Sequence, residues 1–246
     1  MVSIGPLMVP LKLWAQGMPK FALLVGNSKY LGRDRSLANP ESDAQLMAKS
    51  LAAQGFDVSV GFNLGRKDML KAVSDFTERL PEGALSFVFY AGHGMQLGGL
   101  NYLIPVDMQP NSEQAVQLAA LPMRTVMERM AASRAAVNVM VLDACRNNPF
   151  QQEILVRMRS ITPRNGLAAV KAPRGTLVAY STAPGQLAAD GKGGNSLYAD
   201  SLARMLREPG LSLEQIFKRV GQQVRERTAD AQIPWFESSL SDDVFL

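Results

Sequence analysis

The chain contains one histidine and one cysteine, and both stand at the ends of apolar segments that are typical of buried strands. His93 ends the segment that begins at Leu85, and Cys145 ends the segment that begins at Val137. In an open α/β sheet, the carboxyl ends of neighbouring strands meet along one edge, so two such residues can face each other across a cleft. An imidazole beside a thiol can remove the thiol proton and later protonate a leaving amine. These are the requirements of a cysteine-protease dyad.

Each of the two residues also has a simpler interpretation. A lone histidine after a strand is more often structural than catalytic, and a lone cysteine is more often a small buried hydrophobic residue. The simpler interpretation requires two coincidences, because both residues stand at strand ends and are about 50 residues apart. We therefore predict that His93 and Cys145 form a catalytic dyad.

The segment 143–147 around Cys145 resembles an altered form of the caspase signature, and the spacing from His93 is similar to that in caspases. Further segments are similar to caspase-like motifs and occur in the family's order. On these motifs the chain resembles the caspase-like cysteine peptidases (clan CD, family C14), and among them the bacterial metacaspase type, also called orthocaspases. The resemblance covers about residues 21–246 and implies a cysteine endopeptidase. The further segments are 21–28, 37–44, 180–185 and 194–198.

The resemblance also implies roles for residues around the dyad. The backbone N–H groups of Gly94 and Cys145 would hold the oxyanion of the tetrahedral intermediate. Glycine suits this role because a residue without a Cβ lets the backbone approach the substrate closely. Ser181 and Thr182 would line the groove, with their strand pairing through main-chain hydrogen bonds with an extended peptide.

Substrate preference follows from the residue two positions before the cysteine. Caspases, which cut after aspartate, have glutamine there, whereas this chain has Asp143. The resemblance to metacaspases implies a pocket carboxylate that receives arginine or lysine at the substrate's P1 position, and a cation is the favoured guest because an unpaired buried carboxylate is costly. Asp43 is the expected second wall of the pocket; its alternative role is that of a helix-start acid interacting with the macrodipole. The expected partners are proteins or peptides with a basic P1 residue.

A basic stretch that contains prolines covers residues 147–174. It lies where caspase-like proteins carry the linker between their large and small parts, so an enzyme with basic specificity could process itself there. The alternative is a long basic loop, with a helix at 151–158. The candidate self-cleavage positions are Arg157, Arg159, Arg164, Lys171 and Arg174.

Composition excludes several other classes of protein. With 47% apolar and 20% charged residues, the 246-residue chain can bury the core of a soluble enzyme. Its single cysteine cannot form an internal disulfide, and its single histidine leaves no Cys/His cluster for zinc. The net charge of +4 is spread along the chain, so we expect no nucleic-acid partner. Many metacaspases carry calcium-binding acids after the histidine; residues 94–106 contain none, so we expect no calcium, other metal or cofactor.

The elements that must position these residues alternate along the chain. Short apolar runs predict about six strands, and apolar residues at helical spacing predict helices at 43–54 and 67–80. Ser212, followed three residues later by Gln215, predicts a capping box at the start of another helix. This alternation predicts an α/β, caspase-like three-layer fold with a mainly parallel sheet and helices on both faces. The strands are predicted near 21–25, 56–60, 84–90, 102–104, 138–142 and 176–180.

We expect one monomeric peptidase domain at 20–246. It would have a large-subunit-like part to about 150, the basic linker at about 150–174 and a small-subunit-like part at 175–246. Residues 1–19 are expected to be an N-terminal arm or the remnant of a leader, too short to span a membrane. We therefore expect the protein to be cytoplasmic or, if residues 1–19 are the remnant of a leader, exported.

Two other functions are compatible with a sheet of this kind. A Rossmann-type binding domain is disfavoured, because no Gly-x-Gly-x-x-Gly follows the first strand. A catalytically silent caspase-like scaffold, which acts through protein contacts, is the main alternative to the peptidase.

Overall fold

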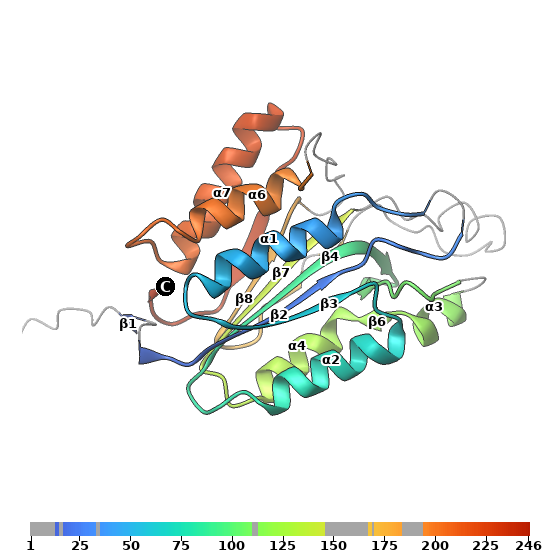
Figure 1. The fold of residues 1–246 in the computed structure, drawn as a ribbon, viewed down its shortest axis with the longest axis horizontal. Helices are drawn as coiled ribbons and strands as arrows, with labels where there is room; N and C mark the ends of the chain where they lie inside the picture. Colours follow the sequence, from blue (N-terminus) through green and yellow to red (C-terminus); the bar gives the residue numbers. More distant parts are fainter. Residues whose placement is uncertain are drawn as a thin grey trace, which may run out of the picture.

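The computed structural model describes residues 13–14, 17–32, 35–109, 113–145, 167–168, 170–183 and 194–246. Its centre is a sheet whose main path has the order β3-β2-β4-β7-β8-β9 (Figure 1). Neighbouring strands from β3 to β8 are parallel, and β9 is antiparallel to β8. The prediction of a mainly parallel α/β sheet is therefore confirmed. These strands are β2 (Lys20–Gly26), β3 (Asp57–Phe62), β4 (Leu85–Leu97), β7 (Val137–Cys145), β8 (Thr176–Tyr180) and β9 (Trp235–Ser238).

β4 is longer than its apolar run predicts. It continues beyond Tyr90 to Leu97, and its last part forms an antiparallel hairpin with β5 (Leu100–Leu103) through the two-residue loop Gly98–Gly99. The short strand β6 (Leu121–Pro122) pairs with β5. At another place in the fold, β1 (Leu13–Trp14) pairs with β10 (Val244–Phe245), which joins the two ends of the described chain.

Helices cover both faces of the sheet, as predicted. One face carries α1 (Pro40–Ala52), α6 (Leu197–Met205) and α7 (Leu213–Thr228), and the other carries α2 (Arg66–Glu78) and α4 (Met123–Ala132) (Figure 1). The short helix α3 (Glu113–Ala119) packs with the β4–β5 hairpin. Among the described helices, none combines the length and the apolar character needed to cross a membrane.

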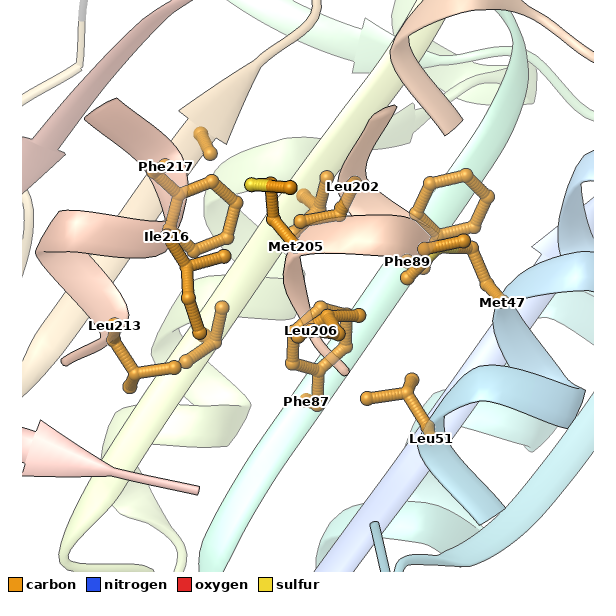
Figure 2. Packing of buried hydrophobic residues seen from close by; sticks show 14 of the residues in the cluster. Met47, Leu51, Phe87, Phe89, Leu202, Met205, Leu206, Leu213, Ile216 and Phe217 are labelled. Carbon is orange, nitrogen blue, oxygen red and sulfur yellow. The ribbon is translucent and has the colours of Figure 1, made fainter. Parts of the chain in front are cut away.

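The two faces of the sheet have separate cores because side chains alternate along a strand. In β4, Phe87 and Phe89 belong to the core under α1, α6 and α7, whereas Val88 and Tyr90 belong to the core under α2 and α4. Figure 2 shows Phe87 and Phe89 facing side chains from α1 and α6, with those of α7 beside them. Because β4 and β7 are buried on both faces, their backbones are fixed from both sides.

Two of the described helices, α6 and α7, begin at a serine cap. The predicted capping box is present: the Ser212 hydroxyl accepts from the Gln215 N–H, and the Gln215 side chain accepts from the Ser212 N–H. α6 begins in a similar way, with Ser196 as the N-cap whose hydroxyl accepts from the Ala199 N–H. A serine N-cap satisfies one of the N–H groups that have no partner within the helix.

Candidate active site

The strand register brings His93 and Cys145 together. The two residues are direct partners in the parallel pair β4·β7, and Ala91 opposes Asp143 two positions earlier. Adjacent strands lie about 4.8 Å apart, so the two backbone positions are as close as neighbouring strands allow. The Cys145 thiol lies outside the described part of the structure.

The His93 imidazole is buried and held from two sides. Its Nε2 lies 2.8 Å from the Arg35 carbonyl oxygen, and its ring lies against the Tyr30 ring with centroids 4.4 Å apart. A carbonyl oxygen can only accept, so this contact assigns the proton of the neutral imidazole to Nε2. Nδ1 is then the basic nitrogen of His93.

The backbone before His93 has a conformation that requires glycine. Gly92 has φ +153°, and a Cβ there would lie 2.5 Å from the Tyr30 hydroxyl and 2.8 Å from the Tyr90 hydroxyl. The space serves hydrogen bonds: the Tyr30 hydroxyl accepts from the His93 N–H (2.7 Å), and the Tyr90 hydroxyl lies 2.8 Å from the His93 carbonyl oxygen. Both backbone groups of His93 are therefore fixed by tyrosines.

The hairpin geometry gives the direction of the Gly94 N–H. The Ile104 N–H donates to the His93 carbonyl (3.1 Å), so Gly94 and its partner Leu103 form a non-hydrogen-bonded pair. In such a pair the N–H groups point away from the partner strand. The Gly94 N–H is thus directed away from β5, toward the side of β4 on which β7 ends.

The segment at 167–168 is anchored beside Gly94. The Asn101 side chain donates to the Ala168 carbonyl (2.8 Å) and accepts from the Ala168 N–H (2.6 Å). Leu167 is buried, and a Cβ on Gly94 would lie 3.3 Å from its Cδ2 and 3.1 Å from the Cβ of Ala144. The chain therefore returns from the linker to a position in contact with the end of β4.

The two predicted pocket carboxylates meet at one residue. Asp43 in α1 and Asp143 in β7 are both buried. The Oδ1 of Asp43 accepts from the Ser196 N–H (2.8 Å) and from the Asn195 side chain (3.0 Å), while the Ser196 hydroxyl donates to Oδ2 of Asp143. Burial and, to a smaller extent, the charge of Asp143 raise the pKa of Tyr198 well above its usual value.

Ser181 and Thr182 follow directly after β8 and are both buried. The Ser181 N–H donates to the Leu142 carbonyl (2.9 Å), and the Gln232 side chain donates to the Ser181 carbonyl (2.7 Å). Both backbone groups of Ser181 are therefore engaged inside the fold. Main-chain pairing with a substrate would depend on Thr182 or on the segment after it.

The five basic candidates for self-cleavage divide into two groups. Lys171 and Arg174 are exposed, but the next N–H group is bonded inside the fold in each case: Ala172 to the Glu237 carboxylate (3.2 Å), and Gly175 to the Ser239 carbonyl (3.4 Å). The remaining three, together with the helix expected at 151–158, lie outside the described residues; they are Arg157, Arg159 and Arg164.

Sequence reasoning missed several residues that fix the site. Tyr30 and Arg35 lie between β2 and α1, and β2 neighbours β4, so their loop reaches the same sheet edge as His93. That rule could have identified the loop, although not which side chain contacts the imidazole. Asn101 could not have been identified from the sequence, because it stands in a short strand with no motif around it. Among the described residues, no group of three or more His, Cys, Asp or Glu side chains is placed to hold a metal ion.

Comparisons with known proteins identify the family of the chain. The caspase-domain family profile matches residues 19–245. The chain is 28% identical over 167 residues to mucosa-associated lymphoid tissue lymphoma translocation protein 1 of Homo sapiens and to its homolog of Mus musculus. The matched region covers 68% of this chain but only 19% and 18% of those two proteins, respectively. From the profile match over nearly its whole length, the chain belongs to the caspase-domain family of cysteine peptidases.

Proposed function

We propose that this protein is a cysteine endopeptidase of the metacaspase type, with His93 and Cys145 as its catalytic dyad and arginine or lysine as the P1 residue of its substrates. The observation that carries the proposal is the direct pairing of His93 with Cys145 at the ends of β4 and β7. Directly paired residues of adjacent strands share a face of the sheet, which suits proton transfer between the two side chains.

The contacts of His93 suggest how the dyad would work. With its Nε2–H held by the Arg35 carbonyl, His93 takes the thiol proton on Nδ1, and the thiolate attacks the scissile carbonyl carbon. The oxyanion that forms accepts from the N–H groups of Gly94 and Cys145. The imidazolium returns its proton to the leaving amine, and water, deprotonated by His93, then hydrolyses the acyl-enzyme.

Basic specificity would come from Asp43 and Asp143. Both are buried and belong to different elements, yet they converge on the N-terminus of α6. Two carboxylates taken out of water favour a cationic guest, and arginine can bond to both through its planar fork. An acidic P1 side chain would be repelled from the same place.

Self-processing follows from this specificity if the linker reaches the dyad. Proteases bind substrates in extended form, whereas the bonds after Lys171 and Arg174 have their N–H groups engaged in the fold. Cleavage after Lys171 or Arg174 would require local unfolding. We therefore propose cleavage at the other three positions, Arg157, Arg159 or Arg164.

A peptide library that varies only P1, incubated with the purified protein, tests the proposal. We expect turnover of peptides with P1 arginine or lysine, none with P1 aspartate, and no change on addition of EGTA. A thiol-directed peptide probe should label Cys145 in the native protein and nothing in Cys145→Ala. Absence of both turnover and labelling would favour the silent scaffold.

A further inference from the structure

Ser196 contacts both predicted pocket carboxylates. Its N–H donates to Asp43 (2.8 Å) and its hydroxyl donates to Asp143, although these two acids are 100 positions apart in sequence. The same hydroxyl accepts from the Ala199 N–H (2.9 Å) as the N-cap of α6. Ser196 therefore fixes one oxygen of each carboxylate relative to a single helix start.

The hydroxyl has little freedom in this arrangement. A serine hydroxyl carries one hydrogen and can accept through two lone pairs. Here its hydrogen is directed to Asp143 and one lone pair faces the Ala199 N–H, and Ser196 is largely buried. Asp143 is thus held by a donor whose own position is set by a helix.

The charges of the two carboxylates explain why a residue that fixes their positions is useful. Asp43 and Asp143 bond to the same residue, so as ionised carboxylates they would repel each other, and burial would leave little water to screen this repulsion. Hydrogen-bond donors and the positive end of the helix macrodipole offset part of this cost. Asn195 adds another donor to Asp43 (3.0 Å).

We propose that Ser196 is a specificity-determining residue that presents Asp43 and Asp143 as one fixed acceptor for a guanidinium group. This inference rests on the proposed function. A guanidinium is planar and has several donors in a fixed fork, so its binding depends on the orientation of both carboxylates. An ammonium is a compact charge with freely rotating donors, and depends on that orientation much less. Ser196 would therefore favour arginine over lysine at P1.

The test compares two serines that cap helices in the same domain. Ser196→Ala removes the donor to Asp143 together with a helix cap. Ser212→Ala removes a helix cap only, because Ser212 caps α7. The backbone of Ser212 also forms an isolated β-bridge with Phe245 in β10. β10 pairs with β1, near the amino end of β2 (Figure 1). Both variants should have lowered melting temperatures, but only Ser196→Ala should change specificity.

Steady-state kinetics with matched P1-arginine and P1-lysine peptides gives the readout. For Ser196→Ala we expect kcat/KM with arginine to fall about 10- to 100-fold, mainly through KM, as for a lost hydrogen bond to a charged group. The arginine-to-lysine ratio should fall toward one. Ser196→Thr keeps the hydroxyl and should restore most of the ratio, and Ser212→Ala should keep the native ratio.

A second variant protects the test against misfolding of Ser196→Ala. Asn195→Ala removes a donor to Asp43 without touching the helix cap, and should also lower the arginine-to-lysine ratio. The inference is overturned if both Ser196→Ala and Asn195→Ala keep the native ratio, or if Ser212→Ala lowers it equally. Failure of the native protein to cleave after either basic residue would instead overturn the proposed function, and this inference with it.

Discussion

Removing the Tyr30 hydroxyl tests whether this loop residue holds His93, the histidine of the proposed dyad. The hydroxyl is the acceptor for the His93 N–H at 2.7 Å, and both residues are almost fully buried. Tyr30→Phe keeps the ring against the imidazole but deletes the acceptor. A buried donor left without a partner costs about 1–3 kcal/mol, so we expect the free energy of unfolding to fall by an amount in this range.

Two measurements separate stability from the position of the imidazole. Denaturant unfolding, done in the Cys145→Ala background to prevent processing, gives the change in free energy. Because His93 is the only histidine, ¹⁵N-labelled histidine gives a single imidazole whose nitrogen shifts report its tautomer directly. We expect the Nε2–H tautomer in the native protein and in Tyr30→Phe, since the Arg35 carbonyl remains in place. In an active background, kcat should fall more than KM rises, because the change acts on the dyad and not on the P1 pocket.

Tyr102→Phe is the matched control. Tyr102 is buried in the neighbouring hairpin, and its hydroxyl has no hydrogen bond to a described residue. Its loss should change the free energy of unfolding by less than about 0.5 kcal/mol. If Tyr30→Phe is no more destabilising than Tyr102→Phe, the Tyr30 hydroxyl is not the acceptor that holds His93. A native Nδ1–H tautomer would refute the assigned role of the Arg35 carbonyl.

Four further predictions concern the dyad, the pocket, the linker and a buried tyrosine. Cys145→Ala and His93→Ala should each abolish peptide turnover, and the double variant should be no worse than either, because the two residues act as one unit. Asp143→Ala should lower kcat/KM for basic peptides by roughly 100-fold, since a charge-assisted contact is lost; the assay is run well below the melting temperature of the variant, because the Ser196 hydroxyl also loses its acceptor. The Tyr198 hydroxyl has its pKa raised in the folded protein, so the stability that this neutral phenol provides is present below the unfolded pKa and is lost as the pH rises through the folded value. Tyr198→Phe should accordingly shift alkaline unfolding, followed by circular dichroism, to higher pH. Mass spectrometry of aged native protein should show cuts that are absent from Cys145→Ala, at one or more of Arg157, Arg159 and Arg164 but not at Lys171 or Arg174.

Much of the sheet could be predicted because most of its strands carry a local signal. The runs at 21–25, 138–142 and 176–180 are apolar, bounded by polar or turn residues, and correspond to β2, β7 and β8. α4 carries such a signal too, since Met123, Val126, Met127 and Met130 have helical spacing and are all buried, and it could have been predicted on the same grounds. β9 could not, because its four residues are all half-buried and show no alternation.

The continuation of β4 beyond Tyr90 could not be predicted because of its glycines. Gly92 and Gly94 flank His93, and glycines after an apolar run usually indicate a turn. Here the strand continues, because the tyrosine hydroxyls occupy the space beside Gly92 and bond to the backbone of His93. The partner Tyr30 is 63 positions away, and hydrogen bonds over such distances leave no periodic trace in a sequence. The same holds for Asn101 with Ala168, and for Ser196 with Asp43.

Two different parts of the fold position the residues of the candidate site, and this difference predicts which kinetic parameter each part controls. The separation of His93 and Cys145 is set by the register of β4 and β7, two strands buried on both faces, so it depends on the cores and not on the loops. The two proposed P1 carboxylates, Asp43 and Asp143, are positioned by Ser196 at the start of α6. Changes in the loop that holds the imidazole should therefore lower kcat at constant P1 preference. Changes at the start of α6 should alter P1 preference while the dyad keeps its reactivity toward a small thiol-directed reagent that does not use the P1 pocket. If a single substitution in either part changed both properties equally, this division of the site into two parts would be refuted.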